Sequence, residues 1–483
     1  MPAPPPGQDL SDLLSDLGAV LGADQIRTEP LELALYGRDA SVMQGTASVA
    51  CLPESAADVQ RIIQVCVRHG RPFMARGSGT GLAGGAVPVE DPVVIATSRM
   101  NRILEVDPAE GVAWVEPGVL NLDLSRSLKA YGVHFAPDPS SQQVCSIGGN
   151  VANNSGGPHC LAYGVTSAHV VAVDVVLPDG RIARLGGLDA EPAGYDLRAA
   201  FVGSEGTLGV AVRIAVRLTQ DPPAVRTLLA DFDSVDAGAA TVSGIIAAGL
   251  VPAAIEMMDQ RAVEMVEAFV GAGYPTDAAA VLLVEVDGLP AGVDAATATI
   301  EEVARGHGVR NVRHAADDAE RDLLWKGRKA AFGAVARIRP DYYLHDTVVP
   351  RTRLVEVLDR VYDIARRNDL VVINVFHAGD GNLHPILAFD ARQPGVLERV
   401  HQAGTEIVQA SLDAGGVLSG EHGIGLEKRD YMPIMFSAAD LAAQDRLRAV
   451  FDPCDLANPA KVIPAGSRCG DLALAQVPAG AWV

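Results

Sequence analysis

Hydrophobic residues recur at helical spacing near the start of the chain, at Leu10, Leu13, Leu14, Leu17, Val20 and Leu21. This spacing predicts an amphipathic helix over residues 10–21. A second periodic stretch predicts a helix over 56–69, and short runs rich in Val and Ile predict strands. The strands are expected at 49–52, 72–75, 93–97, 112–116, 170–177 and 210–218. Gly, Pro, Asn and Asp separate these runs, which indicates an α+β domain.

A second α+β unit is predicted after the turn-forming residues Asp221, Pro222 and Pro223. The uncharged run between Asp236 and Glu256 predicts a packed helix followed by a turn, because it is rich in small residues and contains Pro252. Strands are expected at 280–286, 342–349, 371–376 and 386–389. Helices are expected at 234–248, 294–305, 318–336, 353–367 and 395–413, and one more in the tail that begins at Ala438.

The charge balance narrows the choice of ligand. Lys and Arg number 39 against 60 Asp and Glu, which gives a formal charge of −21. This excess of negative charge argues against nucleic acid or an anionic membrane surface as a partner. An anionic substrate would therefore need a local cluster of positive side chains.

Glycines are concentrated in the segment RGSGTGLAGG, residues 76–85. Gly79, Gly81 and Gly84 match the spacing of a dinucleotide-binding fingerprint, but that fingerprint needs a helix directly after the last glycine. Pro88 follows too soon for a helix. A loop of this kind can still bind a diphosphate through its backbone amides. The alternative, a glycine-rich turn without a ligand, stays open on this segment alone.

Two more glycine-rich segments favour a ligand. Residues 137–164 contain Gly148, Gly149, Asn150, Asn153 and Asn154, and a third segment, GSEGTLGV, spans 203–210. Three such loops in one domain suggest one extended ligand that lies between them, and a dinucleotide has a suitable length.

A histidine motif lies in the predicted second unit. VVINVFHAGDGNLHPILAF (371–389) predicts a strand, a turn and a strand, which would bring His377 and His384 together. Two imidazoles that converge in this way suit a divalent metal, and Glu421 in SGEHGIGLEKRD (419–430) is a candidate third ligand. The alternative is that these histidines only form hydrogen bonds within the turn.

Basic residues cluster in the segment WKGRKAAFGAVARIRPDYY, residues 325–343, which contains Lys326, Arg328, Lys329, Arg337 and Arg339. Such a cluster can hold a substrate carboxylate against the negative charge of the chain. A solvated basic helix face is the alternative for any one of these residues. Tyr342 and Tyr343 are weaker candidates for the pocket.

The three glycine-rich segments together resemble the para-cresol methylhydroxylase/vanillyl-alcohol oxidase (PCMH/VAO) superfamily, in its FAD-linked oxidase branch. The resemblance runs from about residue 45 to 464 and implies an α+β fold. It implies an N-terminal helical segment (1–45), a PCMH-type FAD-binding domain (46–221), a substrate or cap domain with an antiparallel sheet (222–437) and a C-terminal helical segment (438–483) that returns to the FAD domain. The implied FAD contacts are Arg76, Gly77, Ser78, Gly79, Thr80, Gly81, Leu82, Pro137, Asp138, Ser141, Gly148, Gly149, Asn150, Asn153, Gly156, Gly164, Glu205, Gly206, Val210 and Asn458. FAD is expected to be non-covalent, since no histidine lies between Gly70 and His134.

The resemblance also implies chemistry. His377, His384 and Glu421 would bind one divalent metal, with zinc expected first and manganese or iron as alternatives. His422 would accept the hydroxyl proton, and Arg328 would hold the substrate carboxylate. Within the branch, TrpLysGlyArgLys and the two histidine segments resemble glycolate- and D-lactate-oxidising members. The departures at 335–338, at 347–349 and at Ala460 leave a larger D-2-hydroxy acid open.

Partners follow from the same resemblance. No Cys-x-x-Cys pair is present in the sequence, so electrons are expected to leave for an external acceptor. Companion subunits, one with iron–sulfur clusters and one of a second flavin type, are implied. The expected location is cytoplasmic, with peripheral association at the inner membrane through these partners and no direct membrane insertion. The alternatives are a stand-alone D-lactate or D-2-hydroxyglutarate dehydrogenase, a metal hydrolase or a silent scaffold subunit.

Overall fold

The computed structural model describes residues 10–188 and 194–464. The predicted N-terminal and C-terminal segments therefore lie partly outside the described residues, at 1–9 and 465–483. The chain divides into two compact units. The first comprises residues 1–155, 165–220 and 421–483, and the second comprises 156–164 and 221–420. The second boundary was predicted at 437, whereas the segment that begins at Glu421 groups with the first unit.

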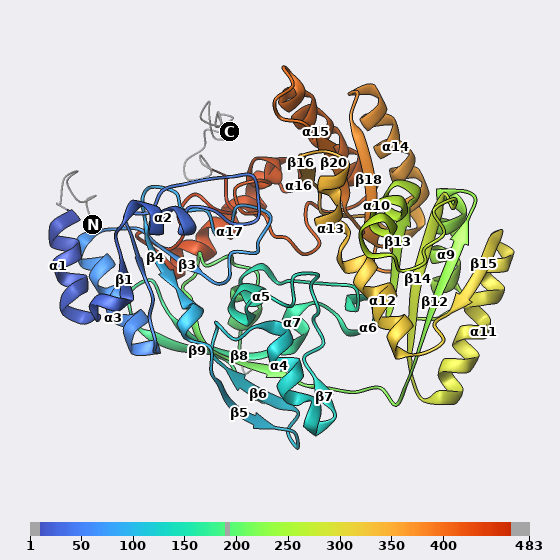
Figure 1. Cartoon of the computed structure of the whole chain (residues 1–483). Helices are drawn as coiled ribbons and strands as arrows, with labels where there is room; N and C mark the ends of the chain where they lie inside the picture. The colour runs from blue at the N-terminus through green and yellow to red at the C-terminus, as the bar shows by residue number, and fades with distance from the viewer. Residues whose placement is uncertain (1–9, 189–193, 465–483) are drawn as a thin grey trace. The chain divides into compact units, whose positions relative to one another are not determined.

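The first unit contains two main sheets (Figure 1). One runs in the order β1 (Ile26–Arg27), β2 (Val49–Cys51), β4 (Val93–Ala96), β3 (Phe73–Arg76), and β2, β4 and β3 are parallel. The other is antiparallel, in the order β5 (Ile103–Asp107), β6 (Val112–Val115), β10 (Val210–Arg217), β8 (Val170–Val176), β9 (Ile182–Gly186). A short ribbon pairs β7 (Val133–His134) with β11 (Thr219–Gln220).

Helices of the first unit complete its cores. They are α1 (Leu10–Val20), α2 (Pro30–Tyr36), α3 (Ala56–His69), α4 (Asn121–Leu128), α5 (Ile147–Asn153), α7 (Thr166–His169), α8 (Leu197–Phe201), α16 (Met432–Met435) and α17 (Ala438–Phe451). α3 begins where the Ser55 hydroxyl accepts the amide of Asp58 and ends at Gly70 with φ of 57°. Its buried face packs with α1 against the parallel sheet, as the apolar spacing predicts.

The second unit is built on a sheet in which every pairing is antiparallel. Its order is β15 (Val309–His314), β12 (Ala224–Phe232), β14 (Ala280–Gly288), β13 (Ala254–Asp259), β18 (Val371–His377), β19 (Asn382–Leu383), β17 (Thr347–Val348). β20 (Pro385–Phe389) pairs with β18 and with β16 (Asp341–Leu344).

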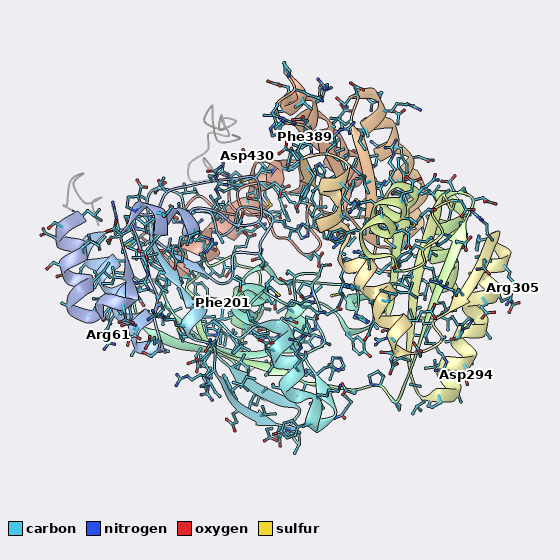
Figure 2. The ribbon with its side chains drawn as sticks, in the orientation of Figure 1. Arg61, Phe201, Asp294, Arg305, Phe389 and Asp430 are labelled. Carbon is cyan, nitrogen blue, oxygen red and sulfur yellow. The ribbon has the colours of Figure 1, made fainter. Side chains whose placement is uncertain are left out.

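Helices cover both faces of this sheet. One face packs into a large apolar core with α9 (Val235–Ala247), α11 (Pro290–Gly306), α14 (Leu354–Arg367) and α15 (Val396–Asp413). Charged side chains of α11, such as Asp294 and Arg305, are exposed to solvent (Figure 2). α10 (Gln260–Val270), α12 (Asp318–Lys329) and α13 (Ala331–Ala334) contact one another, and α10 also contacts β13 and β18. α6 (Cys160–Tyr163) contacts β13.

Several predicted elements differ from the observed ones. The strand expected at 342–349 is two strands, because buried His345 and Asp346 interrupt it. The helix expected at 318–336 ends at Lys329, and α13 and a 3₁₀ turn follow. The second glycine segment contains the helix α5, since the Ser146 hydroxyl accepts the Gly149 amide and caps it. Within the described residues, no helix is both long and apolar enough to cross a membrane.

Candidate functional site

The first glycine segment is a loop between β3 and β4. As predicted, no helix follows Gly84 before β4 begins at Val93, within this described stretch. The backbone amides of residues 78–82 donate no hydrogen bond to any described part of the chain. Successive amide donors of this kind, in residues that are exposed or half-exposed, can form a nest that suits an anionic diphosphate. The loop therefore fits the pyrophosphate of FAD.

The second glycine segment lies directly against the first. A Cβ atom at Gly77 would lie 2.4 Å from Ser146 Oγ and 3.5 Å from the Gly149 nitrogen. A Cβ at Gly148 would lie 2.6 Å from the Pro117 side chain. A side chain at Gly77 would crowd the Ser146 hydroxyl, and one at Gly148 would crowd Pro117, so either substitution would force its neighbours to move. These contacts bring the first two predicted segments into one place.

Asn121 supports the second segment and was not predicted from the sequence. Its side-chain amide donates to the Pro137 carbonyl at 2.9 Å and to Asn150 Oδ1 at 3.1 Å. Both asparagines are buried. The hydrogen bond fixes the orientation of the Asn150 side chain, which belongs to the predicted FAD contacts. Asn121 stands at the start of an ordinary amphipathic helix, and no local motif marks it.

The third glycine segment joins the first loop to the C-terminal tail. The buried Glu205 carboxylate accepts the amides of Ile424 at 2.6 Å and Gly425 at 2.8 Å. Burial raises the pKa of Glu205 to about 7, and burial lowers the pKa of the nearby Lys461 to about 7. Asn458 donates to the carbonyls of Gly85 and Glu205. Glu205 and Asn458 were both predicted as FAD contacts, but their side chains form these hydrogen bonds with the protein itself.

Residues 421–425 are held by the same network. The Asn153 side chain donates to the His422 carbonyl at 2.7 Å. A Cβ at Gly423 would lie 2.7 Å from Glu205 Oε1, and one at Gly425 would lie 2.0 Å from the Ala83 carbonyl oxygen. The backbone of the predicted base His422 is thus fixed relative to the FAD-binding loops of the first unit.

The other predicted FAD contacts differ in burial and in the unit to which they belong. The Arg76 guanidinium donates to the carbonyls of Ala86 and Leu35 and so braces its own loop. Val210 is buried in β10. Gly156 and Gly164 bound a segment that belongs to the second unit. Ala460, where the resemblance leads one to expect glycine, adopts a φ of 62°, a conformation that favours glycine.

The predicted histidine pair is brought together in the second unit. His377 ends β18, and His384 lies between β19 and β20. Their ring centroids are 5.1 Å apart and nearly perpendicular, and one nitrogen of each ring lies within 4.8 Å of the other. Both side chains are buried. An oxygen of Asp346, a residue not singled out from the sequence, also lies within 4.8 Å of a His384 nitrogen.

Hydrogen bonds set the orientation of both rings. His377 Nδ1 lies 2.8 Å from Glu256 Oε1, and His384 Nδ1 lies 3.3 Å from the His345 carbonyl oxygen. Both partners are acceptors, so each Nδ1 carries a proton, and in a neutral ring Nε2 is then the nitrogen that can bind a cation. This is the tautomer that a metal ligand requires, and the donor set fits a divalent metal.

Arg328 is linked to His377 through Glu256, which contacts both side chains, and the Arg328 side chain has no exposed surface. One guanidinium nitrogen is 2.6 Å from Glu256 Oε2, while Nε and Nη1 have no hydrogen-bond acceptor among the described residues. Unsatisfied buried donors are costly. The two donors are chemically suited to a carboxylate, so the assignment of Arg328 as the substrate clamp stays a prediction.

Glu421 and His422 follow Gly420, the last residue of the second unit. The Gly420 amide donates to Asp346 Oδ1 at 3.0 Å, and the Ser419 hydroxyl donates to the other oxygen. A Cβ at Gly420 would lie 2.4 Å from Asn382. The chain is therefore tied to the histidine hairpin one residue before Glu421. The predicted ligand role of Glu421 and the base role of His422 stay predictions.

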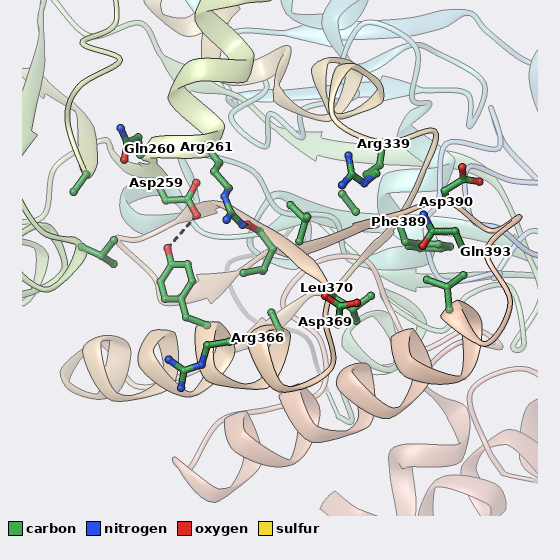
Figure 3. A pocket seen from close by; sticks show the side chains of 18 residues that line it. Asp259, Gln260, Arg261, Arg339, Arg366, Asp369, Leu370, Phe389, Asp390 and Gln393 are labelled. Atoms are coloured by element: carbon green, nitrogen blue, oxygen red, sulfur yellow. Dashed lines mark hydrogen bonds between the residues drawn. The ribbon is translucent and has the colours of Figure 1, made fainter.

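A cavity of about 820 Å³ lies elsewhere in the second unit (Figure 3). It is lined by Asp259 at the end of β13 and by Val371 at the start of β18, whereas His377 stands at the other end of β18. Asp259 accepts the Tyr362 hydroxyl there, and Arg261 and Arg339 also line it. None of the predicted catalytic or metal-binding residues lines this cavity. Arg339, one of the basic residues of the predicted cluster, lines this cavity, whereas Arg328 does not.

Comparison with known families assigns both parts of the chain. Residues 47–186 match the FAD binding domain family, and residues 221–462 match the family "FAD linked oxidases, C-terminal domain". The chain is 44% identical over 429 residues to glycolate oxidase subunit GlcD of Escherichia coli K12, covering 89% of this chain and 86% of the relative. It is 38% identical to GlcD of Bacillus subtilis, covering 95% and 98%. It is 31% identical to D-lactate dehydrogenase of Anaerostipes hadrus, covering 89% and 91%.

Solved structures confirm the predicted fold class. p-Cresol methylhydroxylase with substrate bound superposes with a TM-score of 0.81 at 16% identity, covering 95% of this chain and 98% of that one. 4-Ethylphenol oxidase from Gulosibacter chungangensis superposes with a TM-score of 0.77 at 18% identity, covering 94% and 97%. The matched families and the fold agree with the nest of amides in the first glycine loop. The chain belongs to the family of FAD-linked oxidases and is an FAD-dependent oxidoreductase.

Proposed function

We propose that the chain oxidises a small 2-hydroxy acid, glycolate or D-lactate, to the 2-oxo acid. The observation that carries the proposal is the buried pair of His377 and His384, whose rings lie 5.1 Å apart with each Nδ1 on an acceptor. This pair lies in the matched oxidase domain, and relatives of that domain are glycolate oxidase subunits and a D-lactate dehydrogenase.

Glu421 is proposed as the third metal ligand. Gly420, one residue before it, is tied to Asp346 beside the histidine hairpin, which limits where Glu421 can lie. Two nitrogens and one carboxylate oxygen suit zinc, and the same ligand set can also bind manganese or iron. A divalent metal held by these residues would supply a Lewis acid that lowers the pKa of the substrate hydroxyl, and FAD held by the glycine-rich loops would supply the hydride acceptor.

The remaining tasks fall to the protein. Arg328 holds the substrate carboxylate with the guanidinium donors that have no acceptor in the described chain. His422 takes the hydroxyl proton as general base. Its backbone is fixed by Asn153. The first glycine loop holds the diphosphate of a non-covalent FAD through its amides.

The electron acceptor is proposed to be external. GlcD is named as a subunit in two relatives, which supports companion subunits. One companion would carry iron–sulfur clusters and another would be of a second flavin type. Association at the inner membrane would then be peripheral, through those companions.

Anaerobic reduction of the flavin tests the proposal. The purified yellow holoprotein is mixed with glycolate, D-lactate or D-2-hydroxyglutarate, and the flavin absorbance near 450 nm is followed. We expect rapid bleaching by glycolate or D-lactate and loss of bleaching after metal removal, with FAD retained. Glu421→Ala and His422→Ala should each slow bleaching by about 100-fold or more. A strong preference for the five-carbon acid would contradict the proposed substrate, and bleaching by none of the three would contradict the activity.

A further inference from the structure

Two buried glutamates face α12 from neighbouring strands. Glu256 on β13 is 1% exposed and Glu285 on β14 is 2% exposed. The strands pair directly, with Ala254 opposite Glu285 and Glu256 opposite Leu283. Each carboxylate contacts one histidine and one arginine, and both arginines come from α12. The two clusters are therefore chemically alike and lie side by side in one unit.

The Glu256 cluster includes one member of the histidine pair, His377. Its Oε1 and Oε2 lie 2.8 Å and 3.0 Å from His377 Nδ1, and Oε2 lies 2.6 Å from the Arg328 guanidinium. All three side chains are more than nine-tenths buried. A buried carboxylate needs a compensating cation, and Arg328 provides it. Glu256 thus faces both the Arg328 guanidinium and His377 Nδ1.

We propose that Glu256 is the positioning residue that sets the metal affinity of the histidine pair. This inference rests on the proposed function and deepens it, since it names the residue that prepares His377. The carboxylate keeps the proton on Nδ1, leaves Nε2 as the donor atom and stops the ring from rotating. It also makes the imidazole more basic, which strengthens a bond from Nε2 to a cation.

The Glu285 cluster has a different task. Its carboxylate accepts from His159 Nε2 at 3.2 Å, from Arg321 at 2.7 Å, from the Trp325 indole at 2.7 Å and from the Thr227 hydroxyl at 2.7 Å. His159 lies in the short segment 156–164, away from the pair formed by His377 and His384. Glu285 is thus a matched control that has the same burial and similar partners without a candidate metal ligand.

The test measures metal affinity rather than turnover. The holoprotein is stripped of metal, and zinc is titrated in competition with a fluorescent zinc chelator, while FAD content is measured in parallel. In Glu256→Gln the carboxamide has the size of the carboxylate but no charge. We expect zinc affinity to fall by about 10- to 100-fold with FAD content unchanged. Glu285→Gln should keep the zinc affinity of the wild type.

The outcomes separate this proposal from the proposed function. Wild-type protein that binds no metal overturns both the metal part of the function and the positioning role. Wild-type protein that binds zinc, with unchanged affinity in Glu256→Gln, overturns the positioning role alone. An equal loss in Glu256→Gln and Glu285→Gln also overturns it, because a general loosening of the unit would then be the cause.

A second variant keeps the test decisive if Glu256→Gln does not fold. Glu256→Asp retains the charge beside Arg328 but withdraws the carboxylate from His377 by one methylene group. We expect a loss of zinc affinity between those of the wild type and Glu256→Gln, with FAD still bound. Unchanged affinity in Glu256→Asp would overturn the proposal.

Discussion

At the residue scale, the close contact between the first two glycine-rich segments depends on the absence of a side chain at Gly77. Gly77 lies where a Cβ would be 2.4 Å from Ser146 Oγ, the atom that caps α5. The φ of Gly77 lies outside the left-handed region, so alanine is conformationally allowed there. A substitution at this position therefore tests the close approach itself and not backbone strain.

Gly77→Ala should weaken FAD binding. Either Ser146 gives up the cap or the loop moves away, at about 1–3 kcal/mol, which corresponds to roughly 5- to 150-fold in affinity. The measurement is the FAD content of the purified protein and its dissociation constant after reconstitution. Gly18→Ala is the control, because nothing lies within 4 Å of a Cβ there. The double variant Gly77→Ala/Ser146→Ala should regain part of the affinity. Wild-type affinity in Gly77→Ala would show that the loops are not held together at this point.

At the element scale, periodic apolar patterns predicted the amphipathic helices well. α3 spans the predicted residues because its buried face and its caps are both local signals. β13 was missed, since Glu256 stands between Ile255 and Met257 and interrupts an apolar run. That glutamate is buried only because its partners arrive from distant segments, with His377 121 residues away in sequence. The sequence pattern therefore predicted His377 and His384 as candidate ligands but gave no signal for Glu256, the carboxylate that orients His377.

α12 also shows how an element can serve two sites. Arg321 and Arg328 are seven residues apart, which is about two helical turns, so they share one face. Each forms an ion pair with a buried strand glutamate, although Arg321 itself is partly exposed and Arg328 is not. Arg328 was predicted from the sequence as part of a substrate-binding cluster, and Arg321 was not. The strand partners that separate the roles of these two arginines are not local in sequence.

The Glu285 cluster should make the second unit sensitive to acid. Burial alone would raise the pKa of Glu285, but hydrogen bonds from His159 and Arg321 hold it well below the ordinary value of 4.5. The folded carboxylate therefore stays ionised where the unfolded one takes up a proton, so stability is lost as pH falls below about 4.5. The unfolding temperature of the wild type should drop steeply between pH 5 and 3. Glu285→Gln should be less stable at pH 7 but drop less steeply over that range.

Glu264→Gln is the control for this acid effect, since Glu264 is exposed on α10 in the same unit. Its unfolding temperature should follow the wild type at each pH. Parallel pH profiles for the wild type and Glu285→Gln would contradict the proposed contribution of the cluster.

At the scale of the whole molecule, the charge of −21 opposes the approach of an anionic hydroxy acid. Such repulsion reaches about 30 Å at 0.01 M salt and about 10 Å at 0.1 M salt, so it weakens as salt is added. The buried Arg328 is paired with Glu256 and cannot reverse the long-range field. Binding of substrate, rather than the chemical step, should therefore depend on salt.

Anaerobic flavin reduction by glycolate should show this dependence without interference from the electron acceptor. We expect the apparent substrate dissociation constant to fall by about two- to fivefold between 10 and 150 mM NaCl, while the limiting rate stays constant. Potassium chloride at equal ionic strength should act alike, and sucrose at equal osmolarity should have no effect. A dissociation constant that instead rises with salt would show that a local cluster of cations dominates the field at the entrance. In that case the basic residues of 325–343, rather than the net charge, would govern how the substrate arrives.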